Sequence, residues 1–141
     1  MQDLLDKPII DFIPQRTPFV LVNRVLECNK DFTLSKFRVE ESHLLCVDGA
    51  LQEGGLIENI AQTAAAGHGI LMHLQGKEVV RGFIGSVKKL KIFSLPKKGV
   101  ELITKVENLS EVMNVNIIKG SVRDQKGSLY AECEMNIFLE S

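Results

Sequence analysis

The chain has 141 residues, of which 45% are hydrophobic and 25% are charged. This length and composition are typical of one globular domain, which buries roughly two-thirds of its unfolded surface without a metal or a disulfide. Lys and Arg number 17 and Asp and Glu 18, so the net charge of −1 gives no general attraction to nucleic acids or anionic membranes. We therefore expect a single domain over residues 1–141 that binds neither nucleic acid nor membrane.

The N-terminal segment and the cysteines carry no signal for export or for a metal site. Residues 1–10 contain acids and lack the basic start and apolar run of a secretory signal, and residues 54–74 hold too many polar side chains to span a membrane. The cysteines, Cys28, Cys46 and Cys133, form no CxxC or Cys/His pair, so we expect buried free thiols. These features predict a cytoplasmic protein without a metal.

In chain order, the residue pattern predicts six strands and one long helix. Strands are expected over residues 19–27 and 32–40, paired around residues 29–31. Residues 54–74 change to an apolar stripe at helical spacing, which predicts a helix of roughly 20 residues that Gly76 closes. Four more strands, separated by turn residues, are expected over residues 81–93, 100–107, 112–122 and 128–139. In the last of them apolar and polar residues alternate, which indicates a sheet with one buried face.

One helix and one antiparallel sheet have to cover each other's apolar faces. The helix is rich in Ala and Gly between residues 61 and 69, which keeps it narrow enough for the sheet to approach closely. We therefore predict an α+β hot-dog fold, in which one long central helix is wrapped by an antiparallel sheet. An edge strand is left without a partner, so we expect a homodimer or a higher homo-oligomer.

Two residues have the chemistry of an acid–base pair. Glu58 is the only formally charged residue between Gly54 and Leu74, and an ionised carboxylate in apolar surroundings needs a partner or a function. His43 lies past the end of a strand, ahead of a loop that can fold back over the helix start. In a shared cavity the two would serve as the base and acid of a β-elimination. The alternatives are that Glu58 only interacts with the helix dipole and that His43 is a satisfied polar residue.

Two further features of the helix have weaker signals. Gly54 and Gly55 leave backbone N–H groups at the helix start, where a thioester carbonyl could place its developing negative charge, although a flexible entry turn explains them as well. His68 and His73 are five residues apart, which does not match the i, i+4 spacing of two ligands on one helix face. We interpret both histidines as structural.

Several segments resemble a known family in the family's own order. Residues 13–25, IPQRTPFVLVNRV, resemble the opening LPHRxPFLLVDRV of bacterial 3-hydroxyacyl-[acyl-carrier-protein] dehydratases, and residues 56–62, LIENIAQ, resemble their central-helix motif LIxEAMAQ. Residues 82–99 are similar to the strand and Pro-Gly turn that follow. The segment 42–49, which contains a Ser-His and an Asp-Gly, resembles a divergent subgroup associated with aryl-polyene and related pigment pathways.

The resemblance implies a hot-dog dehydratase that acts on a 3-hydroxyacyl chain held on the phosphopantetheine arm of an acyl carrier protein, with no other cofactor. It implies a catalytic dyad of His43 and Glu58 in a site completed across a homodimer. We expect Gly54, Gly55 and Gln62 to contact the substrate.

The chain also departs from the family's motifs. Gln15 stands where the family has His, the family's GHFP context is absent around His43, and residues 53–55, Glu-Gly-Gly, replace a Pro-Gly. Two alternatives therefore stay open: an acyl thioesterase, which the same fold also serves, and a catalytically silent subunit that pairs with a hot-dog paralogue.

Overall fold

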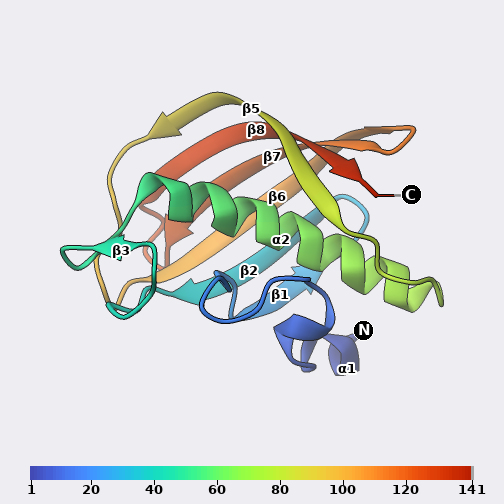
Figure 1. The fold of residues 1–141 in the computed structure, drawn as a ribbon, viewed down its shortest axis with the longest axis horizontal. Helices are drawn as coiled ribbons and strands as arrows, with labels where there is room; N and C mark the ends of the chain where they lie inside the picture. Colours follow the sequence, from blue (N-terminus) through green and yellow to red (C-terminus); the bar gives the residue numbers. More distant parts are fainter. Residues whose placement is uncertain (141) are drawn as a thin grey trace.

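The computed structural model describes residues 1–140 and contains one long helix lying against a six-stranded antiparallel sheet (Figure 1). The short helices α1 (Gln2–Leu5) and η1 (Ile9–Asp11) precede strands β1 (Arg24–Cys28) and β2 (Phe32–Arg38). A small hairpin of β3 (Cys46–Val47) and β4 (Ala50–Leu51) leads into helix α2 (Glu53–Leu74). The remaining strands are β5 (Gly82–Ile92), β6 (Glu101–Val112), β7 (Val115–Asp124) and β8 (Leu129–Leu139).

The six strands follow the order β1-β2-β6-β7-β8-β5, and each pairs antiparallel with its neighbours. The sheet curves around α2, which crosses its inner face (Figure 1). This arrangement confirms the predicted central helix wrapped by an antiparallel sheet. β1 and β5 form the two edges, and β5 is the longer of these edge strands.

Small residues bring the helix and the sheet into close contact. A Cβ on Gly67 of α2 would overlap the side chain of Thr33 in β2, and a Cβ on Gly120 of β7 would overlap Ile60 of the helix. The helix ends as predicted, because Gly76 adopts the left-handed conformation with φ of 69°. Within residues 1–140, no helix is long and apolar enough to cross a membrane.

The two halves of α2 contribute to two apolar clusters. Leu56 and Ile60 pack into the main core with the inner faces of β2, β6, β7 and β8. Ala66 and Ile70 pack against the N-terminal segment, including the buried side chains of Leu5, Phe12 and Ile13. In β8 the buried residues Ala131, Cys133, Met135 and Ile137 alternate with half-buried polar ones, as the sequence predicted.

The strand boundaries differ most from the sequence prediction at the start of β1 and at the turn between β6 and β7. β1 begins at Arg24 instead of residue 19, because the backbone of residues 19–21 bonds to side chains of α2 and not to a strand. β6 continues to Val112, so the turn into β7 falls at residues 113–114, where Met113 has a φ of 57°. The predicted turn at residues 29–31 is confirmed: the Asn29 Oδ1 accepts hydrogen bonds from the N–H groups of Asp31 and Phe32.

Candidate active site

An elongated groove of about 790 Å³ runs beside α2. The helix contributes a stripe of residues spaced at three and four positions, namely Glu58, Ala61, Ala65, His68 and Met72. At 1.5 Å per residue this stripe is about 21 Å long. The opposite walls come from the start of β5 and from the β6–β7 and β8 ends of the sheet. Small side chains on the helix therefore leave room for a long ligand.

Glu58 supplies the carboxylate of the helix wall. It lies in the second turn of α2, is half-buried, and lines the groove. In the described part of the chain, no cation lies within 4 Å of its carboxylate. Its side chain is therefore available to a ligand in the groove.

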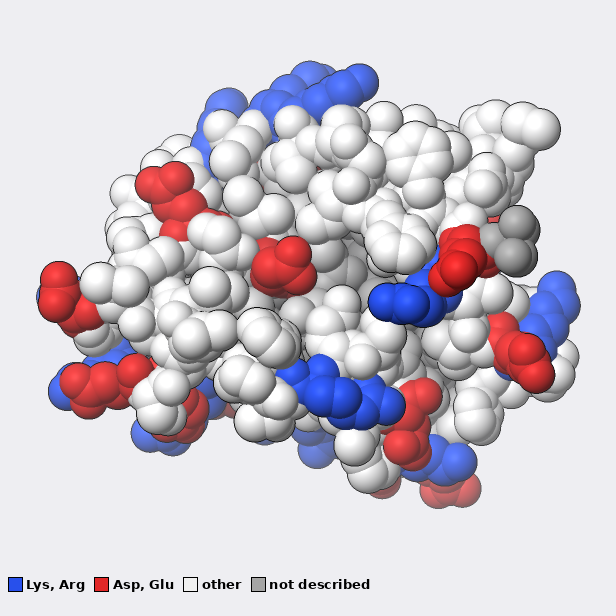
Figure 2. All heavy atoms as spheres, viewed as in Figure 1, with Lys and Arg blue, Asp and Glu red and all other residues white. Residues whose placement is uncertain are grey.

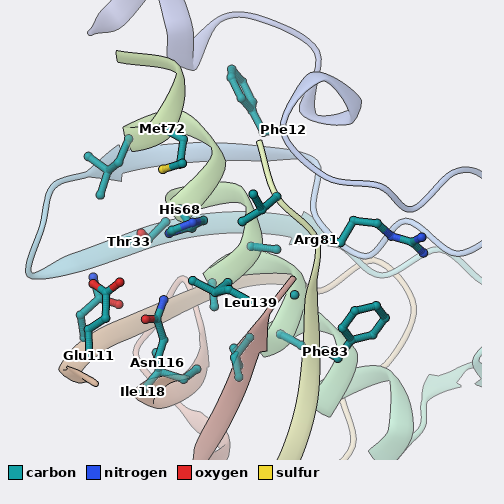
Figure 3. A pocket seen from close by; sticks show the side chains of 18 of the residues that line it. Phe12, Thr33, His68, Met72, Arg81, Phe83, Glu111, Asn116, Ile118 and Leu139 are labelled. Atoms are coloured by element: carbon teal, nitrogen blue, oxygen red, sulfur yellow. The ribbon is translucent and has the colours of Figure 1, made fainter. Parts of the chain in front are cut away.

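Three other polar side chains reach the groove with an atom that is buried and has no hydrogen-bond partner. These atoms are Oε1 of Gln15, Nε2 of His68 and Oδ1 of Asn116. Figure 3 shows His68 projecting from α2, with Asn116 and Glu111 on the sheet side. Burial lowers the pKa of His68, while Glu111 acts in the opposite direction.

The sequence prediction did not assign His68 and Asn116 to a site. For His68 a signal existed, because steps of three and four residues connect it to Glu58 through Ala61 and Ala65. His73, by contrast, is exposed at the end of α2 and packs edge-on against Phe12. Asn116 carries no such signal, since one polar residue in a strand is ordinary.

His43 lies outside the groove of its own chain, in the loop between β2 and β3. Its Nε2 lies 3.1 Å from the Val20 carbonyl, and its Nδ1 accepts a hydrogen bond from the Leu45 N–H at 3.0 Å. Because a carbonyl only accepts, this arrangement assigns the ring proton to Nε2. The ring also packs edge-on against Phe37, with 5.8 Å between the centroids.

Gln62 is fully buried on α2 and faces the N-terminal segment instead of the groove. Its Oε1 accepts from the Leu21 N–H at 2.7 Å, and its Nε2 donates to the Phe19 carbonyl at 2.8 Å. The structure therefore brings Gln62 and His43 to the same short segment, residues 19–21, while Glu58 lies on the groove side.

Neither Gly54 nor Gly55 lines the groove. Gly54 is exposed, with open space where a side chain would lie. Gly55 packs against Leu51, and its N–H donates to the Gln52 carbonyl at 2.9 Å. The Gly55 N–H therefore already has a partner in the turn that opens α2.

The described residues contain no group of three or more His, Cys, Asp or Glu side chains that could hold a metal ion. The three cysteines are free thiols; Cys28 and Cys133 are buried and Cys46 is half-buried.

A long helix wrapped by an antiparallel sheet is the hot-dog fold, and here the helix places one carboxylate, that of Glu58, on the wall of a groove. The sequence model of the ApeP-like dehydratases, described as ApeP dehydratase, matches residues 7–141. The chain belongs to the ApeP-like dehydratase family. The predicted resemblance to a divergent group of hot-dog dehydratases is thereby confirmed. No curated protein matches the chain significantly.

Solved structures share the fold at low sequence identity. A chain of the dehydratase heterocomplex ApeI:P from Xenorhabdus doucetiae is 16% identical with a TM-score of 0.88, over 96% of this chain and 92% of that chain. The uncharacterized protein PH1136 from Pyrococcus horikoshii is 13% identical with a TM-score of 0.69, over 96% and 95%. A hypothetical thioesterase with coenzyme A from Streptococcus pneumoniae is 13% identical with a TM-score of 0.66, over 83% and 87%. At these identities the likeness establishes the hot-dog fold.

Proposed function

We propose that this chain removes water from a 3-hydroxyacyl thioester carried by an acyl carrier protein, with Glu58 and His43 as its acid and base. The observation that carries the proposal is the position of Glu58, a carboxylate at one end of a helix stripe that lines the groove over about 21 Å. Membership of a dehydratase family supports the class of reaction.

In this elimination one C2–H bond and one C3–O bond break, and a C2–C3 double bond forms. His43 takes the C2 proton, and Glu58 in its acid form gives a proton to the C3 hydroxyl, which leaves as water. Transfer of the proton from His43 to Glu58 through solvent restores both groups. Acid–base assistance of this kind supplies about 10²–10⁴-fold in rate. The Gly54 N–H, which like His43 lies outside the groove of its own chain, is our candidate for stabilising the thioester oxygen in a site that two chains share.

The hydrogen bonds of His43 favour Nδ1 as the basic nitrogen of this proposal. Donation from Nε2 to the Val20 carbonyl fixes the tautomer and leaves the lone pair on Nδ1. This lone pair accepts from the Leu45 N–H. For Nδ1 to take up the C2 proton, the hydrogen bond from the Leu45 N–H has to break. The proposal therefore requires that the loop carrying His43 and Leu45 moves locally.

A second hot-dog chain seated on β5 would complete the site, since His43 does not line the groove of its own chain. β5 is an edge strand beside the groove, paired with β8 on one side and with no strand of residues 1–140 on the other, and its Phe83 and Ile84 are 51% and 36% exposed. Figure 2 shows Lys and Arg side chains clustered at the upper edge and further charged side chains along the left, lower and right-hand margins, with few charged side chains between them. Pairing along β5 would cover this apolar surface and close the groove.

The test is the intact mass of short and medium 3-hydroxyacyl carrier proteins incubated with the pure chain. We expect loss of water, and we expect Glu58→Gln to lower kcat by at least about 10²-fold. Glu53→Gln is the matched control, because Glu53 is an exposed acid in the first turn of the same helix and does not line the groove. Equal activity of Glu58→Gln and Glu53→Gln would refute the role of Glu58.

A silent subunit is the second candidate function, because both ring nitrogens of His43 are bonded to backbone groups of its own chain. The ApeI:P structure is a dehydratase heterocomplex, which makes a hot-dog paralogue the partner to test. An inactive pure chain that restores water loss when mixed with such a paralogue would select this candidate. Release of free thiol without water loss would select a thioesterase instead.

A further inference from the structure

Two amide side chains of α2 hold the backbone of the N-terminal segment 19–21. Asn59 and Gln62 are 0% and 1% exposed. The Asn59 Nδ2 donates to the Leu21 carbonyl at 2.7 Å, and Gln62 binds the Leu21 N–H and the Phe19 carbonyl. On its other side the Asn59 Oδ1 accepts from the Thr104 hydroxyl of β6 at 2.5 Å. The segment is thus fixed to the helix, and the helix amide is fixed to the sheet.

The carbonyl of Val20, between Phe19 and Leu21, has a different hydrogen-bond partner. The Phe19 and Leu21 carbonyls bond to α2, whereas the Val20 carbonyl lies 3.1 Å from the His43 Nε2. The Phe19 and Leu21 carbonyls and the Leu21 N–H are held by α2, whereas the carbonyl between them is directed to His43. The position of the Val20 carbonyl therefore depends on the amides that hold its neighbours.

We propose that Gln62 and Asn59 are positioning residues for His43. They hold the Val20 carbonyl where it accepts the Nε2 proton, which orients the imidazole and leaves Nδ1 as the basic nitrogen. Gln62 thus acts through the backbone of residues 19–21 without touching the substrate. The catalytic consequence rests on the proposed function of His43, whereas the effect on the imidazole does not.

Gln62 is a better residue to substitute than Asn59, because both of its side-chain hydrogen bonds go to the backbone of residues 19–21. Gln62→Met keeps a similar length and removes both hydrogen bonds, leaving the Leu21 N–H and the Phe19 carbonyl without partners. These backbone groups then move toward water, and the Val20 carbonyl moves with them. The matched control is Thr63→Val on the next residue of α2. It removes buried hydrogen bonds to Ser35 and to the Asn59 carbonyl and leaves segment 19–21 untouched.

The readout is the pair of ¹⁵N shifts of the His43 ring in the ligand-free protein at neutral pH. In the unmutated chain and in Thr63→Val we expect two well-separated shifts, because one tautomer is held. In Gln62→Met we expect the two shifts to move toward each other as the tautomers mix. If Gln62→Met does not fold, Gln62→Ala takes its place, since it also removes both hydrogen bonds and leaves space for water beside the freed backbone groups. Unchanged His43 shifts in the folded Gln62 variant would overturn the inference.

Kinetics separates this inference from the proposed function. With an active chain, Gln62→Met should lower kcat by up to about 10²-fold, as expected for a misplaced catalytic group, with little change in KM. Thr63→Val should keep the kcat of the unmutated chain. A larger effect on KM than on kcat would make Gln62 a substrate contact and overturn the positioning role. If the unmutated chain removes no water, the proposed function fails, and the ¹⁵N shifts still decide the positioning role.

Discussion

Gly67→Ala tests the close approach of α2 to the sheet. The added Cβ would overlap the Thr33 Oγ1 and lie 2.9 and 3.0 Å from the Thr33 Cβ and Cγ2. Overpacking of a closed contact costs about 1–3 kcal/mol. Replacing Gly by Ala inside a helix by itself stabilises the helix by about 1 kcal/mol. We therefore expect a net loss of stability of up to about 2 kcal/mol, which lowers the Tm by up to about 8 °C in a chain of this size.

The assay is thermal unfolding followed by circular dichroism, with Gly54→Ala as the matched control. Gly54 lies in the same helix and has open space where a Cβ would lie, so this change should stabilise the protein by about 0.5–1 kcal/mol. In a Thr33→Ala background the cost of Gly67→Ala should shrink, because the overlapping Oγ1 and the Cγ2 are gone. A Tm of Gly67→Ala equal to or above that of Gly54→Ala would refute the close contact.

Two further predictions concern titratable side chains. Burial lowers the pKa of His68 below its ordinary value of 6.5, so the unfolded chain binds a proton that the folded one excludes. Stability should therefore fall as the pH drops below 6.5, and His68→Leu should show a flatter pH dependence of Tm; parallel curves would contradict this. Burial raises the pKa of Cys133 to about 11, whereas Cys46 is more exposed. Native alkylation followed by mass should modify Cys46 first and Cys133 last, and equal rates for Cys28, Cys46 and Cys133 would exclude this order.

Local patterns in the sequence predicted most of the fold. The apolar stripe of residues 54–74 and the alternation of residues 129–139 each repeat with the period of one element, so they show which face is buried. The strand predicted from residue 19 was wrong in its first five residues. Its β-branched residues favour a strand, but Asn59 and Gln62, about forty positions later, take the hydrogen bonds that a neighbouring strand would have made.

Some residues of the candidate site were likewise predictable from the sequence, and others were not. By itself the sequence determined the hot-dog arrangement and singled out Glu58, because a lone charge on an apolar helix is visible without knowing any contact. The tertiary structure alone decided that His68 and Asn116 share the groove with Glu58, and that His43 and Gln62 meet at residues 19–21. The reason is physical: burial of a helix or strand face repeats along the chain, whereas a hydrogen bond between distant residues depends on where folding brings two single groups.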